Sequence, residues 1–516
     1  MGELLSPLAQ GFGLLGDPVL WLYVLAGTIF GVIVGALPGI GATLGYGLVL
    51  PFTFVMSPVH AVAMLLSISV GNQYGNSIPA ILMGLPGSPA AVMTVIDGHL
   101  LMKRGEGSAA LGVAFVAALG GQLLSIVFFV LLVVPLSGVA YLFLAPEIFA
   151  LYLLGMVALV SLTGQDVIKG FVAIAFGLGL GLIGLDPINN VGRFDFGVAS
   201  LRSGLDIATV MIGLLAVSEL FRSGRQVFEY RELTGQVTTK VKFPPWRRVR
   251  PTVPAMLGGT VIGTLLGAVP GAGTTPATLV AYQQAKLWSK HPEEFGHGSL
   301  EGIAANEAAQ NASNSGELVP TLALGIPVGG SMVILLGALT VQGFVPGPSM
   351  VREAPELLYA TIAGMLAATI LLLATGWYMG TALLKAVGIS RSIVIVLALA
   401  ITMLGVYALR FRIFDVFVCL AMGLIGYFMH RYAYPPAAAA LAVVLGSEFE
   451  RNLRTGHNIA GRSWTAFLTR PYTMVILAIT LGILALGIFR QRSRARKETS
   501  VEAQLVDAVA RTGHDD

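Results

Sequence analysis

The sequence has little charge, and this scarcity defines its class. Asp, Glu, Lys and Arg together make up only 11% of its 516 residues, whereas soluble domains contain about 25% charged residues. Hydrophobic residues make up 55% of the chain, and the mean hydropathy is +0.80. The composition therefore excludes an ordinary soluble protein and indicates a membrane protein.

Cysteine and metal-binding patterns are also lacking. Cys419 is the single cysteine, so the sequence predicts no disulfide framework and no thiolate metal site. No pair among the seven histidines has the spacing of metal ligands, and we assign no metal-binding residue. Redox chemistry and a resident metal are therefore not expected.

Enzyme motifs are missing as well. The sequence has no Gly-Lys-Ser or Gly-Lys-Thr phosphate-binding loop, so we expect no ATP hydrolysis by this chain. The segment 39–45 has a glycine spacing one residue too long for a dinucleotide loop, and it lies in an apolar block. We expect no catalytic residue, no enzyme activity and no cofactor. Any transport must be driven by an ion gradient, of Na⁺ or H⁺, or by another subunit.

Long apolar runs are abundant. A run of about 17 to 25 apolar residues can cross the hydrocarbon core of a bilayer, and about ten to twelve such segments can be placed in this chain. They predict an all-α polytopic membrane protein. The clearest runs are 108–134, 136–160, 205–221, 357–386, 391–408 and 471–489.

The basic residues gather in a few segments and predict the orientation of the chain. Cytoplasmic loops are enriched in Lys and Arg, and no basic residue precedes Lys103. Lys103 with its neighbour Arg104, the stretch 222–250 and the tail after residue 489 should therefore be cytoplasmic, and the N-terminus external. We interpret the net charge of +4 as this topological signal, not as nucleic-acid binding. The arginines within 451–470 also look cytoplasmic, only one span before the tail, which conflicts with this topology.

The most informative feature is an internal repeat. Residues 27–43 recur as residues 259–275 with nine of seventeen positions identical, and each copy is an apolar helix that runs into a Pro-Gly pair. Proline cannot continue a helix and glycine permits unusual backbone angles, so each break frees N–H and C=O groups that lipid cannot satisfy. Secondary transporters use such broken helices to hold a solute halfway across the bilayer. Gly27, Gly31 and Gly35 are also spaced for close helix approach.

A polar block follows each break. Residues 71–87 and 306–327 share an Asn-Ser pair and then Pro, four residues, Gly, Leu or Ile, and Pro. Aligning the two Asn-Ser pairs requires a three-residue insertion before the second proline. We expect each block to be an amide-rich loop with helical flanks.

These elements predict where solutes bind. Free N–H groups at the start of a half-helix carry about +0.5 elementary charge and suit a carboxylate, and free carbonyl groups at a half-helix end suit Na⁺. Amide and hydroxyl side chains can serve either partner. The predicted substrate-binding residues are Pro38, Gly39, Gly41, Thr43, Asn76, Ser77, Pro270, Gly271, Gly273, Thr275, Asn314 and Ser315. The candidate cation-coupling residues are Asn72, Gly84, Asn311 and Gly325.

Structural explanations of the same residues remain open. A Pro-Gly pair can be a simple kink, and Asn-Ser pairs can bridge helices through hydrogen bonds worth about 0.6 kcal/mol each. The carboxylates near the polar blocks could carry a proton or a cation, since ionisable groups at membrane depth are usually functional, although we expect at least two of them in loops. These carboxylates are Asp97, Glu301, Glu307 and Glu317.

The repeat divides the chain into two halves. The predicted first half is 1–221, a basic cytoplasmic linker covers 222–250, the second half is 251–489, and the cytoplasmic tail is 490–516. The first motif starts from an external N-terminus and the second from a cytoplasmic linker. The halves should therefore form an inverted repeat with broken helices or re-entrant hairpins.

Several blocks together carry a family resemblance. The Gly-x3-Gly-x2-Pro-Gly-x-Gly pattern at 31–41 and 263–273, the block 71–77 and the run 301–327 resemble the large membrane subunit of tripartite tricarboxylate transporters, the TctA family. This resemblance extends over nearly the whole chain. It implies a multi-pass secondary transporter of the bacterial inner membrane that imports citrate or other carboxylates on a Na⁺ or H⁺ gradient. It also implies two partners, a periplasmic solute-binding protein (TctC-like) and a small membrane subunit (TctB-like).

Two alternatives stay beside this interpretation. The chain could transport another small organic anion, or it could be an ion or solute channel. A channel would need a continuous polar pore, whereas the sequence offers two compact polar blocks. For the transporter we expect alternating access around a common site formed by both halves near the bilayer middle, and rocking and elevator motions both remain open.

Overall fold

The computed structural model describes residues 10–37, 41–140, 142–162, 166–186, 189, 191–227, 244–386 and 391–512. Within these ranges nearly all of the ordered structure is helical, and the two strands form one small antiparallel hairpin. This confirms the predicted all-α class. The elements are α2 (Pro18–Ala36), α3 (Ala42–Thr53), α4 (Pro58–Gly75), α5 (Ser77–Met83), η1 (Pro89–Ala91), α6 (Val92–Lys103), α7 (Gly107–Ala140), α8 (Ala145–Leu162), α9 (Val167–Gly181), β1 (Gly184–Leu185), β2 (Gly192–Arg193), α10 (Ala199–Arg202), α11 (Ile207–Met211), the π-helical segment η2 (Ile212–Val217), α12 (Ser218–Val227), α13 (Trp246–Val249), η3 (Arg250–Thr252), α14 (Val253–Gly267), α15 (Thr274–Trp288), η4 (Pro292–Glu294), α16 (Leu300–Leu324), α17 (Gly330–Val341), α18 (Pro348–Glu353), α19 (Pro355–Ala386), α20 (Arg391–Arg410), α21 (Ile413–Arg431), α22 (Pro436–Ile459), α23 (Trp464–Leu468) and α24 (Pro471–Thr512).

Many of these helices are apolar enough for a bilayer. Among the described residues, six helices are long and apolar enough to span a membrane, and five shorter helices of 10–17 residues are also apolar. The run predicted at 136–160 is wrong in its start, because Pro135 lies inside α7, which continues to Ala140 before α8 begins at Ala145. The six longer spans are Pro18–Ala36, Gly107–Val133, Ile207–Gly224, Pro355–Met379, Ile413–Arg431 and Pro471–Ser493.

The repeated glycines hold the first two long helices of each half together. A methyl group added at Gly31 would collide with the backbone of Ile68, and one added at Gly263 would collide with the backbone of Ala309. The other glycines of each stripe face the same partner helix, so α2 packs along α4 and α14 packs along α16. Only glycine permits backbones to come this close in a membrane protein. The close approach predicted from Gly27, Gly31 and Gly35 is confirmed, and the second half has the same packing.

The polar blocks are buried helix and not loops, which corrects the sequence prediction. α16 runs unbroken through the second block, and in the first block Asn76 joins α4 to α5 with helical angles of φ −59° and ψ −30°. Serine and amide side chains fit inside these helices because several bond back onto their own turn. Ser313 donates to the carbonyl of Gln310 at 2.8 Å, and Asn311 donates to that of Glu307 at 3.0 Å.

The two blocks end in the same way, and this fixes how they align. Gly84 (φ 69°, ψ 21°) and Gly325 (φ 71°, ψ 21°) both close their helices in the left-handed conformation, each with its N–H directed to the carbonyl of Pro79 or Pro320. When the two blocks are aligned at these caps, Asn76 of the first block is equivalent to Glu317 of the second. The glycine contacts give the same alignment, because Gly31 contacts Ile68 and its equivalent Gly263 contacts Ala309. The predicted three-residue insertion, which paired the Asn-Ser dipeptides, is therefore wrong.

Equivalent helices of the two halves cross in opposite directions. Ser69 on α4 donates to Asn314 on α16 at 2.8 Å, and Gln310 donates to the carbonyl of Gln73 at 2.7 Å. From Ser69 to Gln73 the chain of α4 runs forward, while the partners on α16 run backward from Asn314 to Gln310. The two helices are therefore antiparallel, as an inverted repeat predicts. The alignment above makes Ser69 equivalent to Gln310 and Gln73 equivalent to Asn314. The two hydrogen bonds therefore join the same two equivalent positions, and a pseudo-twofold axis lies between them.

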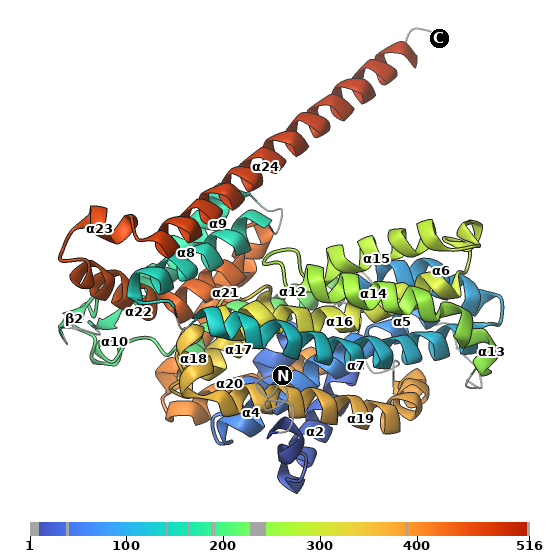
Figure 1. The fold of residues 1–516 in the computed structure, drawn as a ribbon, viewed down its shortest axis with the longest axis horizontal. Coiled ribbons are helices and arrows are strands. Elements are labelled where there is room, and N and C mark those ends of the chain that lie inside the picture. The colour runs from blue at the N-terminus through green and yellow to red at the C-terminus, as the bar shows by residue number, and fades with distance from the viewer. Residues whose placement is uncertain are drawn as a thin grey trace.

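The halves exchange their next long helix. α7 of the first half packs on α16 of the second, and α19 of the second half packs on α4 of the first. Figure 1 shows α7, α14, α16 and α19 lying lengthwise across the molecule, with α24 projecting from it. The helices that carry the polar blocks are thus at the centre of a bundle built by both halves.

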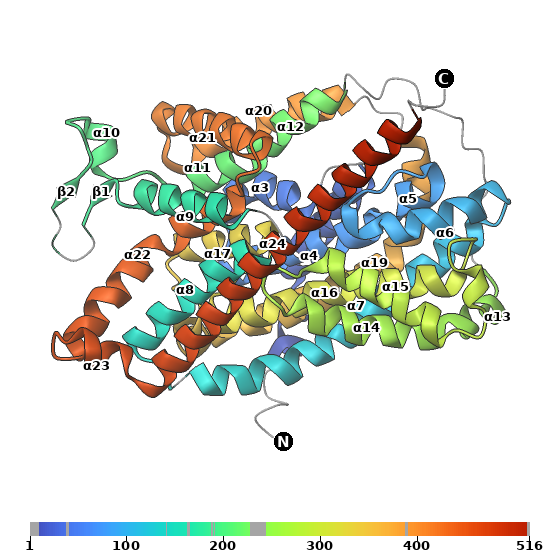
Figure 2. The same ribbon diagram turned by 90° about the horizontal axis from the view of Figure 1, so that it is seen from above.

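The basic segments lie at one end of this bundle. Arg248 pairs with Glu106 at 2.6 Å, so part of the basic stretch 222–250 lies beside the turn that follows Lys103. Figures 1 and 2 place α13 at this end and α23 at the opposite end, with α24 running from the α23 end back toward the α13 end. The arginines of 451–470 therefore lie at the end of the molecule away from α13, and α24 contains one candidate membrane span, Pro471–Ser493. Three of them pair with carboxylates there: Arg451 with Glu448 (3.1 Å), Arg454 with Asp186 (3.2 Å) and Arg470 with Glu147 (2.7 Å). The sidedness of the basic segments stays a prediction.

Candidate functional site: a cavity at the first helix break

The first break opens onto a cavity. α2 ends at Ala36, and α3 begins at Ala42 with Gly41 as its N-cap. The predicted site residues Pro38 and Gly39 lie outside the described residues. Gly41 and Thr43 line a cavity of about 620 Å³, a size typical of small-molecule sites.

Helix starts from three parts of the chain meet at this cavity. Its lining contains Gly41 at the start of α3, Gly330 at the start of α17, and Pro435 with Pro436 at the start of α22. The first two starts are close, because a methyl group added at Gly330 would lie 3.2 Å from the hydroxyl oxygen of Thr43. A helix N-terminus carries about half a positive charge, and the starts of α3 and α17 also present unpaired N–H groups. α22 has Pro435 as its N-cap and Pro436 as its first residue, and neither has an N–H, so it contributes mainly its dipole. The cavity therefore favours anions.

A basic side chain adds to this field, and the sequence prediction missed it. Arg222 of α12 lines the cavity. Its Nε and Nη2 groups donate hydrogen bonds to the carboxylate of Glu219, at 2.6 to 3.2 Å. Among the described residues its Nη1 group makes no hydrogen bond, so two guanidinium donors remain for a ligand. His430 of α21 also lines the cavity. The sequence prediction places Arg222 in the cytoplasmic linker 222–250, and its only distinguishing sequence signal is its position directly after an apolar span.

The turn 86–89 forms another wall and brings the first polar block to the site. A methyl group added at Gly87 would lie 2.7 Å from the Oδ1 atom of Asn76 and 2.6 Å from the carbonyl oxygen of Gly35. Asn76 is thus directly behind the lining. Its Oδ1 atom and the Nδ2 atom of Asn72 are buried without a hydrogen-bond partner, as is the hydroxyl of Ser88, which lines the cavity. These polar atoms can serve a ligand or water.

The second break has the same shape but different chemistry. Gly271 (φ 77°) and Gly273 (φ 65°) make the turn between α14 and α15, following Pro270. The hydroxyl of Thr274 donates to Glu317 at 2.9 Å and accepts from Ser313 at 2.9 Å. A carboxylate of the protein itself therefore occupies the start of α15. Within the described part of the chain, no residue of this break, Thr275 included, lines the 620 Å³ cavity.

The remaining predicted residues point to other partners. Ser315 bonds to Gln122 (3.2 Å) and Ser125 (2.7 Å) on α7, whereas Ser77 donates to Glu307. Asn314 bonds across to α4, as described above. Of the cation-coupling candidates, Gly84 and Gly325 are helix caps, and Asn72 and Asn311 are buried in α4 and α16. Asp97, Glu301, Glu307 and Glu317 all lie in helices, so the expectation that at least two are in loops is wrong.

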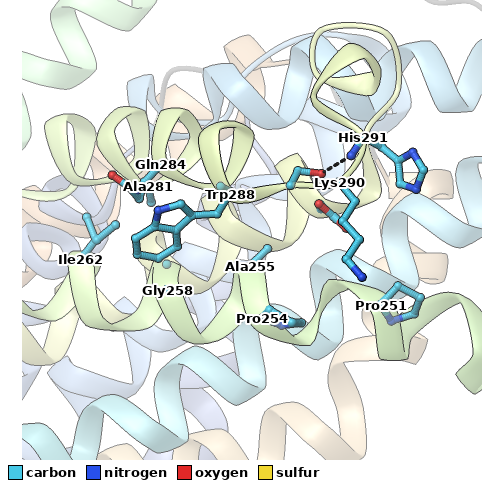
Figure 3. A pocket seen from close by; sticks show the side chains of 14 residues that line it. Pro251, Pro254, Ala255, Gly258, Ile262, Ala281, Gln284, Trp288, Lys290 and His291 are labelled. Carbon is cyan, nitrogen blue, oxygen red and sulfur yellow. Dashed lines mark hydrogen bonds between the residues drawn. The ribbon is translucent and has the colours of Figure 1, made fainter.

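A second cavity, of about 430 Å³, lies at the outer face of α14 and α15 (Figure 3). Trp288 and Ile262 cover part of it, with Lys290 and His291 at one side. It contains no residue of the turn 269–273 that forms the second break. A site reached from both sides of a membrane needs a discontinuous helix, so we place the candidate site at the first break.

The fold and this site define a class of protein: a duplicated, polytopic helical membrane protein with an anion-favouring cavity at a broken helix, as in secondary transporters. The chain belongs to the tripartite tricarboxylate transporter TctA family, whose family model matches residues 21–441. Two similar proteins come from Agrobacterium vitis. An uncharacterized 52.8 kDa protein in the TAR-I ttuC' 3' region is 33% identical over 507 residues, 97% of this chain and 100% of that protein. An uncharacterized protein in the TAR-II ttuC' 3' region is 32% identical over 240 residues, 46% of this chain and 99% of that protein. No solved structure matches.

Proposed function

We propose that this chain is the transmembrane subunit of a binding-protein-dependent carboxylate importer, with citrate-like tricarboxylates as the first substrate class and a Na⁺ or H⁺ gradient as the driving force. One observation carries this proposal. Three helix starts and Arg222 converge on one cavity at a broken helix. Family membership supports the same function.

The cavity suits a multiply charged anion. Three helix starts at about +0.5 elementary charge each and the Arg222 guanidinium give about +2.5, and the Glu219 carboxylate, which also lines the cavity, lowers this to about +1.5. The cavity therefore offsets about one to two negative charges of a ligand. Thr43 and Ser88 supply hydroxyl donors to the same cavity. A carboxylate in this position accepts hydrogen bonds from backbone N–H groups that lipid cannot satisfy.

The proposed transport cycle is alternating access around this cavity, with the two halves moving relative to one another. A periplasmic solute-binding protein delivers the carboxylate, and a small membrane subunit completes the complex in the bacterial inner membrane. Both partners and this location belong to the proposal and are supported by family membership.

Uptake in proteoliposomes tests the function. The complex of this chain with the proteins encoded beside it is reconstituted, and radiolabelled citrate uptake is measured against competing di-, tri- and aromatic carboxylates, under separate Na⁺ and pH gradients. Uptake that needs both the binding protein and a cation gradient supports the proposal. If no carboxylate is taken up under any gradient, the proposal is wrong.

Arg222→Gln tests the site itself. Loss of one charge-assisted hydrogen bond removes about 1.5 to 3 kcal/mol of binding, so KM should rise about tenfold or more, since 1.4 kcal/mol is a factor of ten. Arg202→Gln is the matched control, because Arg202 is exposed on α10 and does not line the cavity. Equal KM values for the two variants would remove Arg222 from the site.

A further inference from the structure

Glu307 is a buried carboxylate enclosed by both halves of the chain. It lies in the middle of α16 and is fully buried. Its Oε1 atom accepts a hydrogen bond from the Thr94 hydroxyl at 2.5 Å, and its Oε2 atom accepts one from the Ser77 hydroxyl. Thr94 and Ser77 belong to the first half of the chain and Glu307 to the second, so the two halves build this site together.

No cation neutralises this carboxylate. Among the described residues, no Lys, Arg or His forms an ion pair with Glu307. The helices α7 and α14, which pack along α16, have no ionisable residue. On the other neighbouring elements, Tyr74 of α4 donates to Gly376, Asp97 of α6 accepts from Tyr282 of α15, and His99 of α6 lies 3.3 Å from the carbonyl of Ile81. Lys103 of α6 and Lys286 of α15 lie in the last turns of their helices and form no ion pair with Glu307. A buried charge without a partner is very costly, so Glu307 must take up a positive charge.

The partners of Glu307 fit a proton better than a metal ion. A hydroxyl can donate to a carboxylate and can also accept from a carboxylic acid, so Ser77 and Thr94 serve both protonation states without moving. Asn306 donates to Thr94 at 2.8 Å and to the carbonyl of Ala90 at 3.3 Å, which holds this arrangement in place. Na⁺ would have to enter between oxygen atoms that are already at hydrogen-bond distance.

We propose that Glu307 is the proton-binding residue that couples carboxylate import to a pH gradient. This inference rests on the proposed function and names its coupling ion. Glu307 binds one proton when the site is open to the periplasm, and the same proton leaves to the cytoplasm after the substrate has crossed, so the charge of the residue is restored in each cycle.

The geometry links this residue to the substrate cavity. Val92 lines the cavity, and Thr94, two residues further along α6, bonds to Glu307. On the other side, Ser77 follows Asn76, which lies directly behind the cavity wall at Gly87. Movement of the turn 86–92 around a substrate therefore reaches both hydroxyl partners of Glu307. This is the connection that coupled transport requires.

Glu307→Gln tests the proposal, because glutamine is uncharged like the protonated acid but cannot release a proton. Vesicles containing the reconstituted complex are loaded with a pH-sensitive dye, and citrate is added outside. The wild type should move protons inward with citrate. The variant should lose this proton flux completely and retain citrate exchange between the two sides, because exchange does not require proton release. Glu301→Gln, at the partly exposed start of the same helix, is the control and should behave as the wild type.

Each outcome is decisive. Substrate-driven proton flux in Glu307→Gln would overturn the proposal, as would wild-type uptake that follows a Na⁺ gradient without proton movement. If the wild type does not exchange any carboxylate, the proposed function fails, which is a distinct result.

A second variant applies if Glu307→Gln also loses exchange. Thr94→Val removes one donor from the charged form, so the pH of half-maximal proton flux should rise. Thr28→Val is its control, since the Thr28 hydroxyl is buried without a partner. An unchanged midpoint in Thr94→Val would overturn the proposal.

Discussion

Gly121 on α7 offers a sharp test of how the two halves pack. A methyl group added there would lie 2.6 Å from the carbonyl oxygen of Ala308 and 2.8 Å from its Cα atom, whereas ordinary contacts begin near 3.4 Å. Backbone atoms cannot rotate away, so Gly121→Ala must move α7 from α16 by most of an ångström. Overpacking of this kind costs about 1 to 3 kcal/mol, and the higher helix propensity of alanine offsets at most about 1 kcal/mol. The variant should lose up to about 3 kcal/mol of stability, or up to about 2 kcal/mol if alanine gains its full helix propensity.

The neighbouring residue provides the control. Gly120 has no atom within 4 Å of an added methyl group, so Gly120→Ala should gain up to about 1 kcal/mol from helix propensity alone. Thermal unfolding of the two purified variants in the same detergent should shift in opposite directions from the wild type. Citrate exchange should fall only in Gly121→Ala. The backbone contact between α7 and α16 would be refuted if the Gly120→Ala and Gly121→Ala variants had equal melting temperatures, or if Gly121→Ala were more stable than the wild type.

Three further substitutions test other buried charges. Glu147→Gln leaves the Arg470 guanidinium without its counterion (2.7 Å), and thermal unfolding should show a loss of about 3 kcal/mol, the low end for a broken buried pair because Arg470 is partly exposed. Asp97→Ala removes the acceptor of the Gly296 and Gly298 N–H groups (2.9 and 2.8 Å), so hydrogen exchange of these two amides should accelerate, and unchanged exchange would contradict the contact. Glu317→Asn should lower stability by about 1 kcal/mol through loss of charge at the start of α15, and acetate in the buffer should restore part of it; a variant as stable as the wild type would contradict this role.

Sequence reasoning succeeded where a feature depends on local pattern. The apolar runs predicted the spans, and the spacing of Gly27, Gly31 and Gly35 predicted that another helix approaches this face closely, because a residue without a side chain at every fourth position has few other uses in a membrane helix. The structure identifies that partner as α4. The duplicated Pro-Gly pair likewise predicted two breaks, although Pro38 and Gly39 lie outside the described residues. These features need no knowledge of the tertiary fold.

The prediction failed where tertiary contacts override local preference. Asn, Ser and Pro indicated loops at both polar blocks, yet α16 is helical throughout, because its side chains find partners on α4, α6 and α7. Matching the Asn-Ser pairs by letter concealed the true alignment, which follows the helix caps at Gly84 and Gly325. Arg222 was missed because only the fold brings α12 to the first break.

The corrected alignment explains why a duplicated protein can have one anion site. Glu317 in the second half replaces Asn76 in the first, and Thr274, whose hydroxyl binds Glu317, replaces Ala42. The Glu317 carboxylate thus lies at the second helix start. Among the described residues no carboxylate hydrogen-bonds to the start of α3, which faces the cavity, where Glu219 is paired with Arg222. If both breaks were open, each would attract an anion, and the protein would have to carry two bound anions in one transport step. In the proposed transport cycle, closing one break with Glu317 would leave a single substrate position while keeping the symmetric scaffold that alternating access requires.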